Sequence, residues 1–251
     1  MFSIVIITKN EQSIIEKTLL SIQGLSNDII IVDSGSTDNT IKICEKYNLT
    51  IIQTSWEGYG ENKNIGIKAA KNDWILSIDA DESVDSTLKD SLLKLDLTSE
   101  NIVYKIKRRN FFLHKEIRYG SWGKDAPLRI FNRKTTLWNN TNVHESLLLP
   151  KEIKIRSING YLNHHTVNSV YDYIIKHMKY AKLNAINYHN SGKKAGVVKL
   201  FLSPIFNFVL NFFFRLGFLD GWEGFLICKT NAVYTFYKYV FLRELNKKHQ
   251  L

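Results

Sequence analysis

The sequence predicts an α/β fold in which a mostly parallel sheet is flanked by helices, with an amphipathic helical region at its C-terminal end. Over residues 1–100, apolar runs rich in Ile and Val alternate with stretches of helical periodicity, which is typical of parallel strands buried on both faces. Several of these runs end abruptly in polar residues. From residue 169 onward the apolar residues recur at helical spacing. We therefore expect a first domain at 1–165 and a helical region at 166–251.

The first hundred residues should contain four strands in chain order. Each run is short, apolar and bounded by turn or capping residues, as buried strands usually are. Helical patterns separate the runs; the first of these stops near Gly24 and the last ends near Lys71. The expected strands are Ser3–Thr8, Ile29–Asp33, Thr50–Thr54 and a fourth that ends at Asp79.

Residues 101–165 change in character and predict further strands. Residues 103–112 alternate in part and are very basic, and residues 127–131 form another apolar run. Residues 163–166, Asn-His-His-Thr, are expected to end a short strand.

Two carboxylates follow the fourth expected strand. Asp79 and Asp81 are separated by one residue, so both can point into the same crevice and hold a divalent cation together with substrate phosphates. Taken alone, the pair is more typical of a solvated acidic turn. A calcium loop is disfavoured, because Val84 occupies the position where such a loop needs Gly. Polar residues also follow the first two strands, and the ends of parallel strands meet at one edge, which favours the metal interpretation.

Composition excludes several classes of protein. The 44% apolar content supports a core but not a polytopic membrane protein, and two distant cysteines suggest neither a disulfide framework nor a zinc site. The N-terminus runs straight into an apolar strand, so we expect no signal peptide.

The net charge of +10 is unevenly distributed along the chain, with −7 over residues 1–100 and +17 over residues 101–251. A basic half suits nucleic acid, an anionic membrane or a phosphorylated acceptor. We expect no nucleic acid, because the aromatic residues cluster in an apolar helix.

Three blocks of sequence, taken in order, resemble glycosyltransferase family 2. They are Ile-Val-Ile-Ile-Thr-Lys-Asn-Glu (4–11), Ile-Val-Asp-Ser-Gly-Ser-Thr-Asp-Asn-Thr (31–40) and Asp-Trp-Ile-Leu-Ser-Ile-Asp-Ala-Asp-Glu (73–82). Within that family, the chain is most similar to bacterial β-glycosyltransferases of lipopolysaccharide core synthesis. The resemblance implies a Rossmann-like GT-A fold, a nucleotide-sugar donor, a divalent cation (Mg²⁺ or Mn²⁺) and inversion at the anomeric carbon.

The resemblance also implies roles for individual residues. The Asp79-Ala80-Asp81 sequence corresponds to the DXD motif of the family, with Asp81 as the principal metal ligand. Many members carry two acids after the second strand, whereas this chain has Ser34, which leaves recognition of the base less defined. Lys63 could instead be a solvated lysine at a helix start. The residues expected to bind the nucleotide sugar are Thr8, Asn10, Glu11, Asp33, Lys63 and Asp79.

The expected catalytic base is Glu145. An inverting transfer needs a base for the proton of the acceptor hydroxyl, and Val-His-Glu (143–145) matches the position of the acidic base in the family. His144 could take the proton instead, or orient the glutamate. His164 is expected to be the late histidine that binds the metal or the diphosphate, with His165 as its rival.

The second informative stretch is residues 193–219, with a repeating pattern over residues 199–215. A polar residue recurs every fourth position, and the remainder is apolar apart from Pro204, so a helix here would carry a narrow polar stripe opposite a broad apolar face. Leu200–Phe214 contains 15 residues without a charge, fewer than the ~20 that span a bilayer. We therefore expect a helix in the membrane interface, although a buried helix or an oligomer interface would show the same pattern.

These observations lead to one expected function and two alternatives. The chain is expected to be a metal-dependent inverting hexosyltransferase, peripheral on the cytoplasmic face of the inner membrane. It would move a hexose such as glucose from a UDP-sugar to a lipid-linked, phosphorylated glycan such as lipopolysaccharide core. The alternatives are a sugar-phosphate nucleotidyltransferase and a non-catalytic carbohydrate- or membrane-binding protein on the same scaffold.

Overall fold

The computed structural model describes residues 1–251 except 124, 140–144, 168 and 249–251. The chain divides into two units. Unit 1 contains residues 1–109 and 125–164, and unit 2 contains residues 110–124 and 165–251. The segment 110–124, which lies inside the first predicted domain, thus groups with the C-terminal helices.

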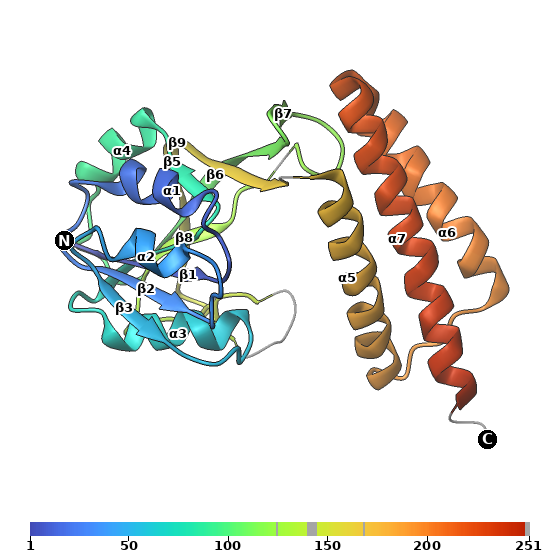
Figure 1. The fold of residues 1–251 in the computed structure, drawn as a ribbon, viewed down its shortest axis with the longest axis horizontal. Coiled ribbons are helices and arrows are strands. Elements are labelled where there is room, and N and C mark those ends of the chain that lie inside the picture. The colour runs from blue at the N-terminus through green and yellow to red at the C-terminus, as the bar shows by residue number, and fades with distance from the viewer. Residues whose placement is uncertain (124, 140–144, 168, 249–251) are drawn as a thin grey trace. The chain divides into compact units, whose positions relative to one another are not determined.

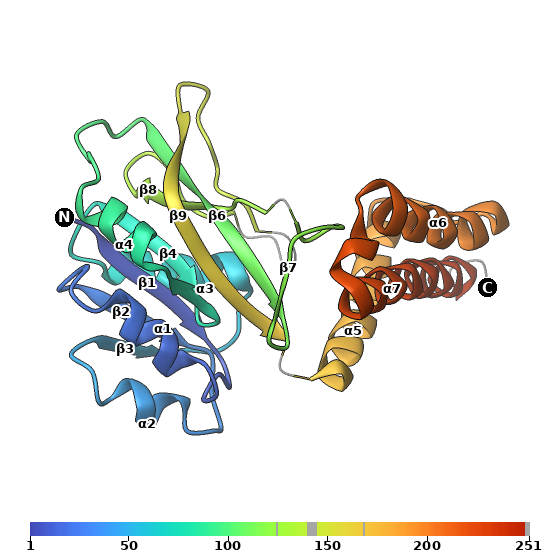
Figure 2. The same ribbon diagram turned by 90° about the horizontal axis from the view of Figure 1, so that it is seen from above.

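Unit 1 is built on four parallel strands in the order β3-β2-β1-β4, which can be followed in Figure 2. This order confirms the parallel sheet that the apolar runs predict. Three strands lie within one residue of the predicted bounds, and the fourth ends at Asp79 as expected. The four are β1 (Ser3–Thr8), β2 (Ile29–Asp33), β3 (Thr50–Gln53) and β4 (Trp74–Asp79).

Antiparallel strands extend the same sheet beyond β4. The order continues β8-β6-β9-β5, and β7 pairs with the end of β6. The short strand expected to end at residues 163–166 is in fact 14 residues long. The polar residues along it hide its length, because a half-exposed strand need not form an apolar run. These strands are β5 (Glu82–Val84), β6 (Ile102–Phe112), β7 (Lys115–Ile117), β8 (Leu128–Asn132) and β9 (Lys154–Val167).

Helices cover both faces of the parallel strands (Figure 1). Alternate residues of β1 point to opposite faces, so Ile4 and Ile6 pack against α1 (Ile15–Ile22), α2 (Thr40–Cys44) and α4 (Ser86–Leu93). Val5 and Ile7 pack on the other face with α3 (Tyr59–Ala69). Burial on both faces explains why β1 is apolar throughout rather than alternating.

Unit 2 contains three long helices. They are α5 (Val170–Asn190), α6 (Val197–Val209) and α7 (Gly221–Lys248), with a π-helical turn at Leu210–Phe214 and a 3-10 helix at Gly217–Asp220 between the last two. Helix α7 packs along both α5 and α6 (Figure 1). The helical C-terminal region is therefore present as predicted.

Asp220 anchors the segment 110–124 within unit 2. Its buried carboxylate accepts hydrogen bonds from the backbone N–H groups of Arg118 and Tyr119, and its carbonyl accepts one from Lys115 Nζ at 2.6 Å. Gly224 allows the start of α7 to lie close to the 3-10 helix before it, because a Cβ at this position would lie 2.1 Å from the carbonyl oxygen of Gly217. A larger residue at position 224 would force the start of α7 away from the preceding turn.

The exposed side of α6 and the following turns is apolar. The predicted polar stripe does not all face water: Asn211 is buried and donates to the carbonyl of Asn207 at 2.8 Å, and Arg215 donates to Asn211 Oδ1 at 3.1 Å. These hydrogen bonds join residues of the stripe to one another along the helix. Among the exposed residues are Val198, Phe201, Leu202, Ile205, Phe206, Phe213, Phe214, Phe218, Leu219 and Trp222.

The apolar helical stretch is also longer than the uncharged run Leu200–Phe214. Over the described residues, Val197–Phe214 is a helical segment long and apolar enough to cross a membrane by length and composition, and only 6% of it is buried. Val197 and Val198 extend the apolar stretch past Lys199, the one charged residue in the segment. We name the exposed apolar side chains of residues 197–222 the apolar face.

The two units differ sharply in charge. Unit 1 carries 19 Lys/Arg and 19 Asp/Glu, whereas unit 2 carries 15 and 5. The whole net charge of +10 therefore belongs to the unit that carries the apolar face.

Candidate active site

The parallel strands bring three predicted site residues to one edge of the sheet. In the register of β1 and β2, Thr8 lies beside Asp33, and in that of β1 and β4, Ile7 lies beside Asp79. Thr8 is buried, and its hydroxyl has no hydrogen-bond partner among the described residues. A buried orphan hydroxyl is uncommon and suits a position that meets a ligand.

The loops after β1 and β2 are joined to one another. Asn10 adopts a left-handed conformation at φ 57°, and its side-chain oxygen accepts a hydrogen bond from Thr37 N at 2.8 Å. The backbone N–H of Glu11 donates to Thr40 Oγ1 at 2.8 Å. Asp33 accepts hydrogen bonds from the backbone of Gly35 and Ser36, which follow it. Asn10, Glu11 and Asp33 thus lie at the carboxyl edge of the sheet. Asp33 stabilises the turn that follows β2.

Helix α3 supplies Lys63 to the same edge. The helix lies close against the sheet because Gly66 faces Val5, where a Cβ would approach within 2.5 Å. Its polar residues 62–64 are all buried and bind partners on other segments. Asn62 donates to Ser34 Oγ at 2.8 Å, and Asn64 exchanges hydrogen bonds with the backbone of Trp138. The helix thereby ties the loop after β2 to the segment that leads toward Glu145.

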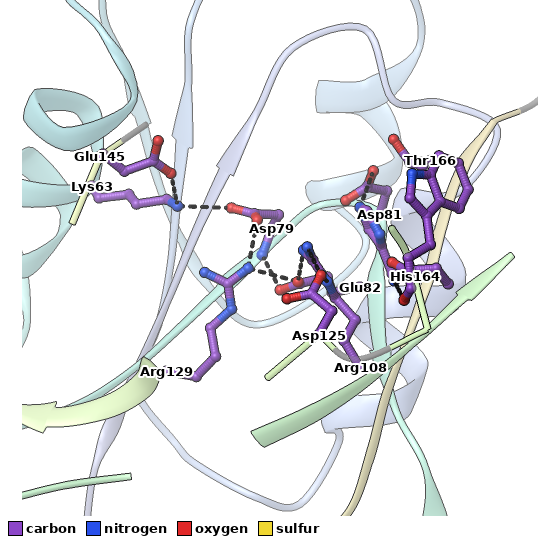
Figure 3. Close-up of polar contacts among 12 residues, drawn as sticks. Lys63, Asp79, Asp81, Glu82, Arg108, Asp125, Arg129, Glu145, His164 and Thr166 are labelled. Atoms are coloured by element: carbon purple, nitrogen blue, oxygen red, sulfur yellow. Dashed lines mark hydrogen bonds and ion pairs between the residues drawn. The ribbon is translucent and has the colours of Figure 1, made fainter. Parts of the chain in front are cut away.

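Lys63 joins two of the predicted site residues. Its ammonium lies 2.8 Å from Glu145 Oε1 and 3.0 Å from Asp79 Oδ1 (Figure 3). It also lies 4.6 Å from the centre of the Trp138 ring. The Lys63 side chain is only 1% exposed, so it is not the solvated lysine that the sequence leaves open. His144, the alternative base, lies outside the described residues.

A second buried cation holds Asp79 from the other side. Arg129 lies on β8 and is 4% exposed; its guanidinium contacts Asp79 Oδ2 at 2.7 Å and Glu82 Oε1 at 2.6 Å. Glu82 is fully buried, and it also pairs with Arg108, which in turn contacts Asp125. The guanidinium groups of Arg108 and Arg129 are therefore paired with carboxylates inside unit 1.

This network keeps Asp79 ionised. Burial by itself raises the pKa of a carboxyl, but the cations of Arg129 and Lys63 outweigh it and hold the pKa of Asp79 far below its usual range. Asp79 is thus a fixed negative charge between two buried cations.

Asp81 lies on the turn after β4, next to His164 (Figure 3). The β5 and β9 register pairs Glu82 with His164, which brings His164 Nε2 to 3.3 Å from Asp81 Oδ2. His165 instead stacks on Phe111, with ring centres 4.4 Å apart. Neighbouring residues of a strand face opposite ways, so the structure separates these two histidines and brings His164 to the carboxylate.

The comparisons with known proteins agree with this arrangement. Residues 3–147 match the model of glycosyl transferase family 2. The chain belongs to glycosyltransferase family 2. It is 30% identical over 239 residues to the lipopolysaccharide core biosynthesis glycosyltransferase LpsC of Rhizobium meliloti (strain 1021), covering 92% of this chain and 87% of that protein. It is 31% identical to an uncharacterized glycosyltransferase of Rickettsia bellii (strain RML369-C), covering 96% and 85%.

Among solved structures, the family 2 chain is similar to Staphylococcus aureus TarS 1-349 in complex with UDP. The TM-score is 0.47 with 18% identity, over 99% of this chain and 91% of that one. Family membership and the mixed α/β sheet described above confirm the predicted GT-A fold class.

The residues present fit a divalent cation that is shared with a substrate. Among the described residues, no cluster of three or more His, Cys, Asp or Glu side chains could hold a metal by itself. Mg²⁺ is usually bound by one or two protein carboxylates, with substrate phosphates completing the shell. Asp81 and His164 offer such a partial set, whereas both oxygens of Asp79 lie against Lys63 and Arg129.

Sequence reasoning missed the residues that support the site. Asn62, Asn64 and Glu82 received no role, because they bind partners that are distant in the chain. One signal was available for Arg129, which is the single charge within the apolar run 127–131. A charged residue inside a buried strand needs a partner, and here that partner is Asp79.

Proposed function

We propose that this family 2 glycosyltransferase is a metal-dependent inverting enzyme that transfers a hexose from a UDP-sugar to a lipid-linked, phosphorylated glycan. The observation that carries this proposal is the double contact of Lys63. One buried ammonium holds the expected base, Glu145, and the carboxylate at the end of β4, Asp79. The two residues come from sequence positions 66 apart and meet at the edge where parallel sheets bind ligands.

Glu145 suits the role of general base. Its carboxylate is 19% exposed, so one side faces Lys63 while the group stays accessible from outside. Lys63 would fix the orientation of Glu145, whose carboxylate would accept the proton of an acceptor hydroxyl. In-line attack by that hydroxyl would then give a β-linked product.

The donor would bind along the carboxyl edge. Thr8, Asn10, Glu11 and Asp33 lie on the two joined loops there, and we assign them to the nucleoside part of the donor. A divalent cation at Asp81 and His164 would stabilise the negative charge that develops on the leaving diphosphate. Asp79, held between Lys63 and Arg129, would face the ribose.

Unit 2 supports a position on the cytoplasmic face of the inner membrane. Its apolar face combines exposed Phe, Leu, Ile and Trp side chains with a net charge of +10, which favours an anionic surface. Helix α6 packs along α7, and α7 carries seven charged residues that the bilayer core would exclude. We therefore propose that α6 lies in the interface rather than across the membrane.

The same basic unit suits a phosphorylated acceptor. Since Arg108 and Arg129 are paired inside unit 1, acceptor phosphates would meet lysines of unit 2. LpsC, the relative named for lipopolysaccharide core biosynthesis, supports an acceptor of this class.

The deciding experiment measures donor turnover across a panel of nucleotide sugars, with Mn²⁺ or Mg²⁺ and then with chelator. We expect metal-dependent release of nucleoside diphosphate from one donor, most strongly from a UDP-hexose. Release of pyrophosphate would instead identify a nucleotidyltransferase. No turnover and no thermal shift with any donor would favour a non-catalytic binding protein.

A further inference from the structure

An apolar groove runs between α6 and α7 in unit 2. Its volume is about 600 Å³, within the range of small-molecule sites. Phe201, Ile205 and Phe208 of α6 form one wall, and Phe225 and Val233 of α7 form part of the other. None of its lining residues is acidic, so the groove offers apolar contact and no negative charge.

The groove continues the apolar face. Phe201 and Ile205 line the groove and are more than half exposed, so the same side chains belong to both surfaces. Trp222 of the apolar face stacks on Phe225 of the groove, with ring centres 5.5 Å apart. A molecule lying along the apolar face could therefore enter the groove without crossing a polar barrier.

One cation lies at the groove. Lys229 lines it, is exposed, and has no ion pair among the described residues. The nearest acid along the helix in the N-terminal direction, Glu223, is engaged by Lys115 at 2.8 Å. The site thus combines an apolar trough with a single unpaired positive charge.

We propose that this groove binds one acyl chain of an anionic membrane phospholipid, with Lys229 facing the headgroup. The shape and the apolar walls fit a hydrocarbon chain, and Lys229 with the net charge of the unit selects a negative head. The inference deepens the proposed membrane association, because an inserted chain would fix the enzyme at one depth and orientation on the bilayer.

The experiment uses a spin-labelled fatty acid below its micelle concentration, without vesicles, so it does not depend on membrane binding as a whole. We expect the full chain to immobilise a single molecule of the probe, as electron paramagnetic resonance detects. Val233→Trp fills the groove and should weaken binding about tenfold, since about two methylene groups lost from burial have that effect. Phe214→Ser, which changes the apolar face outside the groove, should bind the probe as the unmodified chain does.

A second comparison tests the positive charge of Lys229. Lys229→Glu should weaken binding of the acid probe but not of its neutral methyl ester, and this surface change carries little risk to folding. Equal immobilisation by all variants would overturn the proposal, as would an equal loss of acid and ester. If the unmodified chain is a dimer and Val233→Trp a monomer, the groove is a contact between copies. Donor hydrolysis without lipid should remain unchanged in every variant, which separates this proposal from the proposed function.

Discussion

The two units of this chain use charge in opposite ways. Unit 1 has no net charge, and it buries ionic groups in its interior, where Lys63, Arg129 and Glu82 are each less than 5% exposed. Unit 2 carries +10 and leaves apolar side chains such as Phe206 and Trp222 exposed. Burying charges is costly unless they are paired, and exposing a large apolar patch usually marks an interaction surface. The difference suggests that unit 1 carries out the reaction and that unit 2 determines where the enzyme is located.

The sharpest test of unit 1 is the replacement of its base. Glu145→Gln should lower the rate of glycosyl transfer by about 10²–10⁴, because the amide cannot accept the proton of the acceptor hydroxyl. Donor binding, followed by calorimetry, should change little. Glu152→Gln alters an exposed glutamate in the same part of the chain and should keep full activity. Unchanged transfer by Glu145→Gln would move the base to another residue.

The second test contrasts two lysines of α3. Lys63→Met leaves Asp79 and Glu145 without their shared cation, and we expect a loss of about 3–5 kcal/mol in the free energy of unfolding. Lys68→Met removes an exposed lysine that lies 3.7 Å from Glu61, and it should cost less than about 1 kcal/mol. Urea denaturation measures both. Similar small losses would mean that the buried ion pairs contribute nothing net to stability.

Unit 2 can be tested through its apolar face. The double change Phe206→Ser and Phe214→Ser should weaken binding to anionic vesicles at least about tenfold, because each side chain withdraws apolar area from water on insertion. Leu93→Ser, which changes an exposed leucine of unit 1, serves as the control and should bind normally. Co-sedimentation with vesicles reports the difference. If Leu93→Ser weakened binding equally, the assignment of location to unit 2 would fail.

The smallest expected effect concerns the cysteines, where the two units should behave alike. Burial raises the pKa of Cys44 in unit 1 to about 11, with a further contribution from Asp33, and burial raises the pKa of Cys228 in unit 2 to about 11 as well. A higher pKa leaves less thiolate at any given pH, so alkylation at pH ~8 should be slow for both thiols in the folded chain. The rate should climb as the pH approaches that value. Mass spectrometry after brief iodoacetamide treatment checks this, and rapid labelling of either thiol at pH ~8 would show that it is accessible as thiolate.

The sequence was sufficient for the parallel half of the sheet because its signals are local. Each of β1, β2 and β4 is a mostly apolar run, and the polar residue that ends it marks the ligand edge. The pairing of Arg129 with Asp79 could not be read in this way, since it depends on the register between β8 and β4. The length of β9 was missed for a related reason, because its exposed side carries polar residues that resemble a loop.

The predicted polar stripe of α6 shows a different limit. Periodicity placed Asn207 and Asn211 on one side of a helix, but it could not tell which side meets water. The packing of α6 on α7 decides that question, and this packing is tertiary. Which carboxylate acts as the base, and which groups meet the nucleotide, remain predictions that the geometry supports through Lys63.

Helix α3 has a consequence for engineering this enzyme. Polar residues on a helix are usually the first positions chosen for random mutagenesis, because substitution there is commonly tolerated. On α3 the polar residues Asn62, Lys63 and Asn64 bind Ser34, Glu145 and the backbone of Trp138, while Gly60 and Gly66 leave no room for a side chain. A library that seeks new donor preference should therefore spare this helix and vary the joined loops after β1 and β2 instead.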